Sequence, residues 1–122
     1  MRNLSDLKAM ELSKCLCEIA PHAENIFRDG AVTEALDDYH KQINGNTSVQ
    51  TGFGLFVKDV FPVLMGKHED DVYAIFAALD GVSVDEIKNR NGVEFMRDIF
   101  RGFVLDGDLV SIFRPGIETR GE

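Results

Sequence analysis

Residues 67–81, KHEDDVYAIFAALDG, carry the clearest helical pattern in the chain. Apolar side chains recur there at i, i+3, i+4 and i+7, namely Val72, Ile75, Phe76 and Leu79. Acidic residues fill the first turn, and Gly81 stands where a left-handed C-cap belongs. No segment alternates apolar and polar residues convincingly enough to indicate a strand. The pattern therefore predicts an all-α protein.

The N-terminal part predicts two helices separated by a proline. An apolar stripe marks the first helix over residues 5–20, with Ser5 as its N-cap. Pro21 is expected to end this helix and to begin a short second one over 21–28, which Gly30 closes.

A third helix is expected over residues 33–43, with Thr33 as its cap. The segment 44–52, NGNTSVQTG, is rich in turn-forming residues, and its flanks lack the alternation of hairpin strands. It is expected to connect an N-terminal helical half, 4–43, with a C-terminal half, 53–114.

The apolar run GFGLFVKDVFPVLMG, residues 52–66, is too short and too charged to cross a membrane. On a helical wheel its apolar side chains gather on one side: Phe53, Phe56, Val57, Val60, Phe61, Val63 and Leu64. Pro62 leaves two alternatives open: one helix bent by the free carbonyl of Lys58, or a break at Phe61 followed by a new helix. In either case, this run is expected to form the centre of the bundle.

N-caps mark two later helices. Ser83 and Glu86 have the spacing of a capping box, which starts a short helix. Asn91 and Glu94 repeat the same spacing, and the helix that follows is expected to extend to about Leu105.

A last short helix is expected within DGDLVSIFR, capped by Asp106 or Asp108 and stopped by Pro115. The predicted fold is a compact bundle of about six to eight short helices without a sheet. It forms a single domain, 1–114, and residues 115–122 are expected to be a flexible tail.

The chain is acidic, with a formal net charge of −8 over 122 residues. Nucleic-acid binding requires clustered Lys and Arg, whereas the basic residues here are scattered singly. The 21 acidic residues are also spread along the chain rather than concentrated. We therefore expect a solvated surface and no nucleic-acid partner.

The sequence predicts a location in the cytoplasm. The N-terminus lacks the apolar core of a signal peptide, and no apolar run is long enough to span a membrane. Cys15 and Cys17 lie two residues apart on one helix, so their side chains diverge and are expected to be reduced thiols.

No catalytic, cofactor-binding or metal-binding residue is expected. His22, His40 and His68 occur singly, without the ligand spacing of a metal site. The glycines at 52 and 54 lack the remaining residues of a phosphate-binding loop. No serine or cysteine lies in a nucleophile motif, so the protein is expected not to be an enzyme.

The chain has nine phenylalanines, and seven of them lie between Phe53 and Phe103. Apolar residues cover about half of the helix around 93–105, which is more than one core-facing stripe requires. The surplus indicates either a helix buried on two sides or a face that binds a partner. If it is a partner face, the candidate binding residues are Phe53, Phe56, Phe61, Phe95, Ile99 and Phe103.

The segment from LMGKHEDDV to DLVSIF resembles the small tail assembly chaperones of long-tailed, siphovirus-type phages and prophages. The elements that carry the resemblance are His68 to Val72, Asp80-Gly81, Ser83 to Ile87, Asn91-Gly92 and Asp108 to Phe113. The N-terminal pattern LSxxLCEIAP also fits this family.

The resemblance implies a non-enzymatic chaperone that binds the long, apolar tape measure protein and promotes tail tube assembly. Its expected partners are the tape measure protein and the tail tube protein, and self-association into a homo-oligomer stays open. Such a protein acts in the cytoplasm of the bacterial host and is not part of the finished virion.

Two other functions stay open. The first is an acidic regulatory or anti-defence phage protein, which binds a protein or mimics DNA and would need a contiguous negative face. The second is a minor structural component of the tail.

Overall fold

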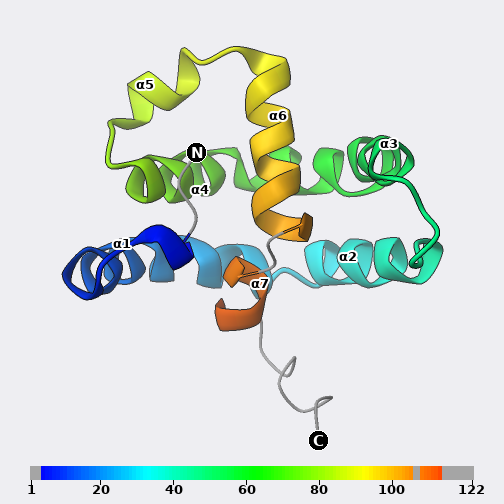
Figure 1. Ribbon diagram of the computed structural model, residues 1–122, viewed down its shortest axis with the longest axis horizontal. Helices are drawn as coiled ribbons and strands as arrows, with labels where there is room; N and C mark the ends of the chain where they lie inside the picture. The colour runs from blue at the N-terminus through cyan, green and yellow to red at the C-terminus, as the bar shows by residue number, and fades with distance from the viewer. Residues whose placement is uncertain (1–3, 106–107, 114–122) are drawn as a thin grey trace, which may run out of the picture.

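The computed structural model describes residues 4–105 and 108–113, and this part of the chain is all-α, without a strand (Figure 1). Its elements in order are η1 (Leu4–Asp6), α1 (Ala9–Phe27), α2 (Gly30–Gln42), α3 (Val49–Asp59), α4 (Phe61–Asp80), α5 (Val84–Lys88), α6 (Gly92–Phe100), the π-helical η2 (Arg101–Leu105) and α7 (Asp108–Phe113). The predicted compact helical bundle is therefore confirmed. The predicted cap at Asp106, the stop at Pro115 and the tail at 115–122 lie outside the described residues.

The helices form two layers with one helix across them. Figure 1 shows α1 and α2 along one side, α4 and α3 along the other, and α6 crossing them. Helix α1 packs mainly on α4, and α7 contacts both α1 and η2. One hydrophobic core contains residues from both halves of the chain, because both halves contribute fully buried side chains such as Ile19, Leu36, Phe76 and Ile99.

Helix α1 continues through Pro21, so the predicted break there is wrong. Proline has no N–H to bond the carbonyl of Cys17, but both residues are exposed and water can reach that carbonyl. Ile19, Ala23 and Ile26 are fully buried on the opposite side of the helix. Burial of this stripe on both sides of Pro21 outweighs the single missing hydrogen bond.

Two predicted helix starts also differ. Helix α1 begins at Ala9, after a 3-10 turn that contains Ser5. Asp29, not Thr33, caps α2, because its Oδ1 accepts a hydrogen bond from the Ala31 N–H at 2.9 Å. Gly30 therefore opens α2 rather than closing a preceding helix.

The loop after α2 is shorter than predicted. Ser48 caps α3, and its Oγ accepts a hydrogen bond from the Thr51 N–H at 3.1 Å. Gly52 is therefore a helical residue, and its carbonyl accepts a hydrogen bond of 2.9 Å from the buried Tyr39 hydroxyl of α2. A Cβ at position 52 would lie 3.2 Å from that hydroxyl oxygen, so glycine allows the two helices to approach closely.

The apolar run at 52–66 is divided between α3 and α4, which meet at Val60. Pro62 lies in the first turn of α4, where its missing N–H costs no hydrogen bond. Of the two alternatives, the break is correct, one residue earlier than Phe61.

The predicted caps at Gly81, Ser83 and Asn91 are confirmed. Gly81 ends α4 with φ 70° and ψ 34°, the left-handed conformation that glycine favours. Ser83 Oγ accepts from the Glu86 N–H at 3.1 Å, and Asn91 Oδ1 accepts from the Glu94 N–H at 3.0 Å.

The helix that Asn91 caps does not stay α-helical to Leu105, because residues from Arg101 onward form a π-helix. In this segment the neighbouring residues Gly102 and Phe103 are both buried.

Candidate functional site

The candidate binding residues do not form an exposed aromatic face. Phe56, Phe95, Ile99 and Phe103 lie in the hydrophobic core. Phe53 and Phe61 are partly buried and pack against it. Most of the apolar surplus of the sequence is therefore used inside the molecule.

Ring contacts show which of these residues meet. Phe100 of α6 lies between Phe53 and Phe56 of α3, with ring centroids 5.3 and 5.4 Å away. Phe103 instead faces Phe27 of α1 at 6.1 Å. Phe95 stacks on Tyr73 at 5.7 Å, so the candidate residues are divided among separate parts of the core.

The large apolar side chains that are exposed among the described residues lie elsewhere. They are Met10, Val49, Val84, Val93, Leu105 and Ile112. Leu105 and Ile112, each 52% exposed, lie just before and within α7. The sequence analysis missed them, although Ile112 lies within the apolar stretch DLVSIF.

A groove of about 570 Å³ runs between α1 and α7. We call this the α1–α7 groove, and it is lined by Ala20, Pro21, Glu24, Phe27, Arg28, Ile112 and Phe113. The lining is mainly apolar, and its polar part is a weak ion pair of 3.6 Å between Glu24 and Arg28. Such a groove can receive apolar side chains of another protein.

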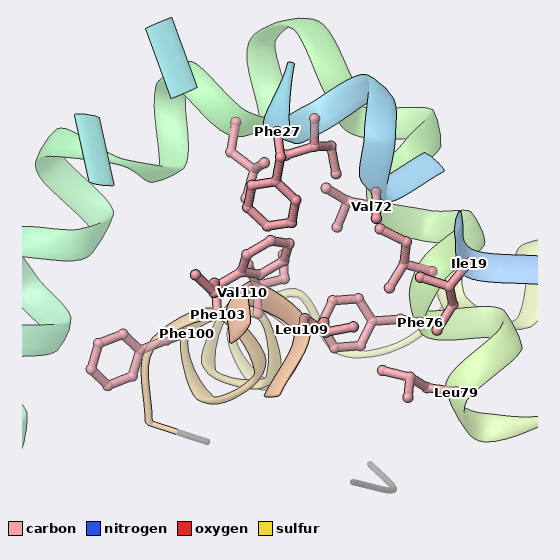
Figure 2. Close-up of a cluster of buried hydrophobic side chains, with 14 of the residues drawn as sticks. Ile19, Phe27, Val72, Phe76, Leu79, Phe100, Phe103, Leu109 and Val110 are labelled. Carbon is pink, nitrogen blue, oxygen red and sulfur yellow. The ribbon is translucent and has the colours of Figure 1, made fainter. Parts of the chain in front are cut away.

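Beneath α7 lies an aromatic surface, which we call the α7 seat: Phe27, Phe76 and Phe103. Figure 2 shows Leu109 directed toward Phe76 and Val110 beside Phe103. Leu109 is 3% exposed and Val110 6% exposed, so α7 covers the seat closely.

A second groove, of about 560 Å³, lies between α1 and the α4–α5 region. The small side chains of Ala74, Ala77 and Ala78 line it on α4, and Cys17 and His22 line it on α1.

A chain of polar side chains joins α1, α2 and α4. His68 Nε2 lies 2.8 Å from Asp29 Oδ2, and His68 Nδ1 lies 3.3 Å from Asp71 Oδ2. Asp71 Oδ1 also lies 2.8 Å from His22 Nδ1 and accepts a bond from the Asn25 amide at 3.3 Å. His68 itself has non-helical dihedral angles, φ −124° and ψ 25°, so the chain of contacts meets α4 at its kink.

These contacts lower the pKa of both carboxyl groups. The hydrogen bond with His68 lowers the pKa of Asp29 below its ordinary value of 3.8, and the Ala31 N–H adds to this effect. Burial alone would raise the pKa of Asp71, but its hydrogen bonds, led by the one with His22, lower it below 3.8. Both side chains are therefore stabilised as carboxylates. Their contacts with His22 and His68 link α1, α2 and α4.

Within residues 4–105 and 108–113, no group of three or more His, Cys, Asp or Glu side chains is arranged to hold a metal ion. In the same residues, none of the helices is long and apolar enough to cross a membrane. Comparison of the chain with protein-family models, with curated proteins and with solved structures found no match.

Proposed function

We propose that this chain is a non-enzymatic tail assembly chaperone of a long-tailed phage or prophage. In this role it binds an apolar helical segment of the tape measure protein and keeps that protein soluble until tail tube subunits assemble around it. The α1–α7 groove carries the proposal, because it exposes apolar side chains from two helices at one place.

The binding face is the α1–α7 groove rather than the phenylalanines of α3 and α6, which are engaged in the core. Ile112 is half-exposed at the groove, and the partly buried Phe113 lies next to it. An apolar stripe of a tape measure helix would bury these side chains and release the water that covers them.

The acidic character of the chain supports the same role. A net charge of −8 makes complexes of the chain with its partner repel one another, which keeps them in solution. The chain would act in the host cytoplasm and leave before the virion is complete, so mass spectrometry of purified virions would not detect it.

Co-expression tests the proposal. The tape measure protein encoded in the same phage genome is produced with and without this chain, and its soluble fraction is measured. We expect soluble tape measure protein and a complex that survives purification only when the chain is present. Insoluble tape measure protein and no complex would contradict the proposed function.

A further inference from the structure

We infer that the α1–α7 groove and the second groove bind one and the same amphipathic helix, which crosses α1 at Pro21 and carries basic side chains beside its apolar stripe. That this helix belongs to the tape measure protein rests on the proposed function. The surface formed by the two grooves is a feature of this chain and can be tested without that partner.

The two grooves meet on α1, because Pro21 lines both of them. A glutamate three residues away lines each groove, Glu18 the second groove and Glu24 the α1–α7 groove. Residues three apart are neighbours on a helix surface and form a row that runs obliquely to the helix axis. The row of Glu18, Pro21 and Glu24 therefore leads from one groove into the other.

The side chains around the crossing are compact. Cys17 lies one turn before Pro21 on α1, and Ala74 and Ala78 lie one turn apart on α4, where they line the second groove. The distance between two packed helices depends on the side chains at their contact. Short side chains at this place allow the backbone of a further helix to come close to α1 and α4.

Each groove also contributes an exposed apolar side chain, Val84 in the second groove and Ile112 in the α1–α7 groove. A partner confined to the α1–α7 groove would leave Val84 in water. A helix that crosses α1 covers both side chains and releases the water around them.

The charges define the chemistry of the partner. Glu18 and Glu24 are exposed on either side of Pro21, whereas the cations Lys14 and Arg28 lie one turn farther out on α1. The ion pair of Glu24 with Arg28 is long, at 3.6 Å, and both side chains are largely exposed, so it holds Glu24 only weakly. The centre of the crossing is thus acidic, and it is complementary to basic side chains at the centre of the bound helix.

Pro21 adds a hydrogen-bond acceptor at the same place. Proline has no N–H, so the carbonyl of Cys17 lacks the donor that an uninterrupted α-helix would supply. Because Cys17 and Pro21 are both exposed, a lysine or arginine that pairs with Glu18 can also donate to this carbonyl.

Two synthetic peptides test the surface. Both are blocked helices of about 18 residues with the same leucine stripe, which lysines border in one peptide and glutamates in the other. Binding is measured by calorimetry and by the reaction of Cys17 with a thiol reagent, because Cys17 is exposed and the other cysteine, Cys15, is buried. We expect the lysine peptide to bind at least about tenfold more tightly than the glutamate peptide and to slow the labelling of Cys17.

Equal affinities, no binding of the lysine peptide, or unchanged labelling of Cys17 under saturating lysine peptide would overturn the inference.

Charge reversal separates this surface from the acidity of the whole chain. Glu18→Lys and Glu34→Lys change the net charge equally, and Glu34 is exposed on α2, outside the linings of both grooves. We expect Glu18→Lys to bind the lysine peptide at least about tenfold more weakly than the wild type, and Glu34→Lys to keep most of the affinity. Equal losses would indicate general attraction to an acidic chain and would contradict a crossing at Pro21.

The tape measure protein gives the last measurement. If the wild type and Glu18→Lys bind it equally and Cys17 stays reactive in the complex, the inference is wrong and the proposed function stands. If the wild type does not bind it, although the lysine peptide protects Cys17, the proposed function is wrong and the binding surface across α1 stands.

Discussion

The imidazole of His68 joins α4 to the start of α2, with its Nε2 atom 2.8 Å from Oδ2 of Asp29. The same Asp29 side chain caps α2 through Ala31, and the same ring lies 3.3 Å from Asp71. The side chain that caps α2 is thus also in contact with α4, a relationship that the local sequence around Asp29 does not show.

Acid should lower the stability of the folded protein by protonating the carboxylates of Asp29 and Asp71. The pKa values of Asp29 and Asp71 are lower in the folded protein than the ordinary 3.8, so their contribution to stability is present above pH 3.8 and is lost as the pH falls below it. Thermal unfolding is measured from about pH 2.5 to 5.5 for the wild type, Asp71→Asn and the exposed neighbouring variant Asp70→Asn.

We expect the melting temperature of Asp71→Asn to fall less steeply with acid than that of the wild type, because one of the two carboxylates is already absent. The Asp70→Asn variant should follow the wild type. Parallel curves for all three proteins would show that the polar chain contributes nothing to acid sensitivity.

Two glycine substitutions should have opposite effects. A Cβ at position 102 would lie 3.2 Å from the Phe76 ring, so Gly102→Ala should lower the free energy of unfolding by about 1–3 kcal/mol. At position 66, within α4, a Cβ meets nothing within 4 Å. There Gly66→Ala should raise the free energy of unfolding by about 0.5–1 kcal/mol, since alanine is the better helix former. Urea unfolding measures both, and a gain for Gly102→Ala would contradict the tight packing.

Replacing Pro21 should stabilise α1. In a helix interior, alanine is favoured over proline by about 3 kcal/mol, and up to about 1 kcal/mol of this is offset by greater freedom of the unfolded chain. Pro21→Ala should therefore raise the free energy of unfolding by about 2 kcal/mol. An unchanged or lower value in urea unfolding would indicate that the helix breaks at Pro21 after all.

Local chemistry was predictable where a single turn decides the structure. The caps at Gly81, Ser83 and Asn91 could be predicted because the backbone conformation and hydrogen bonds of a cap involve only a few neighbouring residues. Pro21 was misjudged because burial of Ile19 and other residues against distant helices outweighs a local preference.

The functional surface was less accessible to sequence analysis. A helical wheel shows that Phe53 and Phe56 share a side, but not that Phe100 from α6 lies between them. The α1–α7 groove likewise joins Pro21 to Ile112, residues that only the folded chain brings together.

Affinity for the tape measure protein tests the central claim most directly, with Ile112→Asp compared against Val93→Asp. The two residues are similarly exposed, 52% and 54%, but only Ile112 lines the α1–α7 groove. A charge at Ile112 would have to be buried by the bound helix, so we expect calorimetry to show a loss of at least about tenfold for Ile112→Asp. Val93→Asp should bind like the wild type. Wild-type affinity for Ile112→Asp, or equal losses for both variants, would contradict binding at this groove.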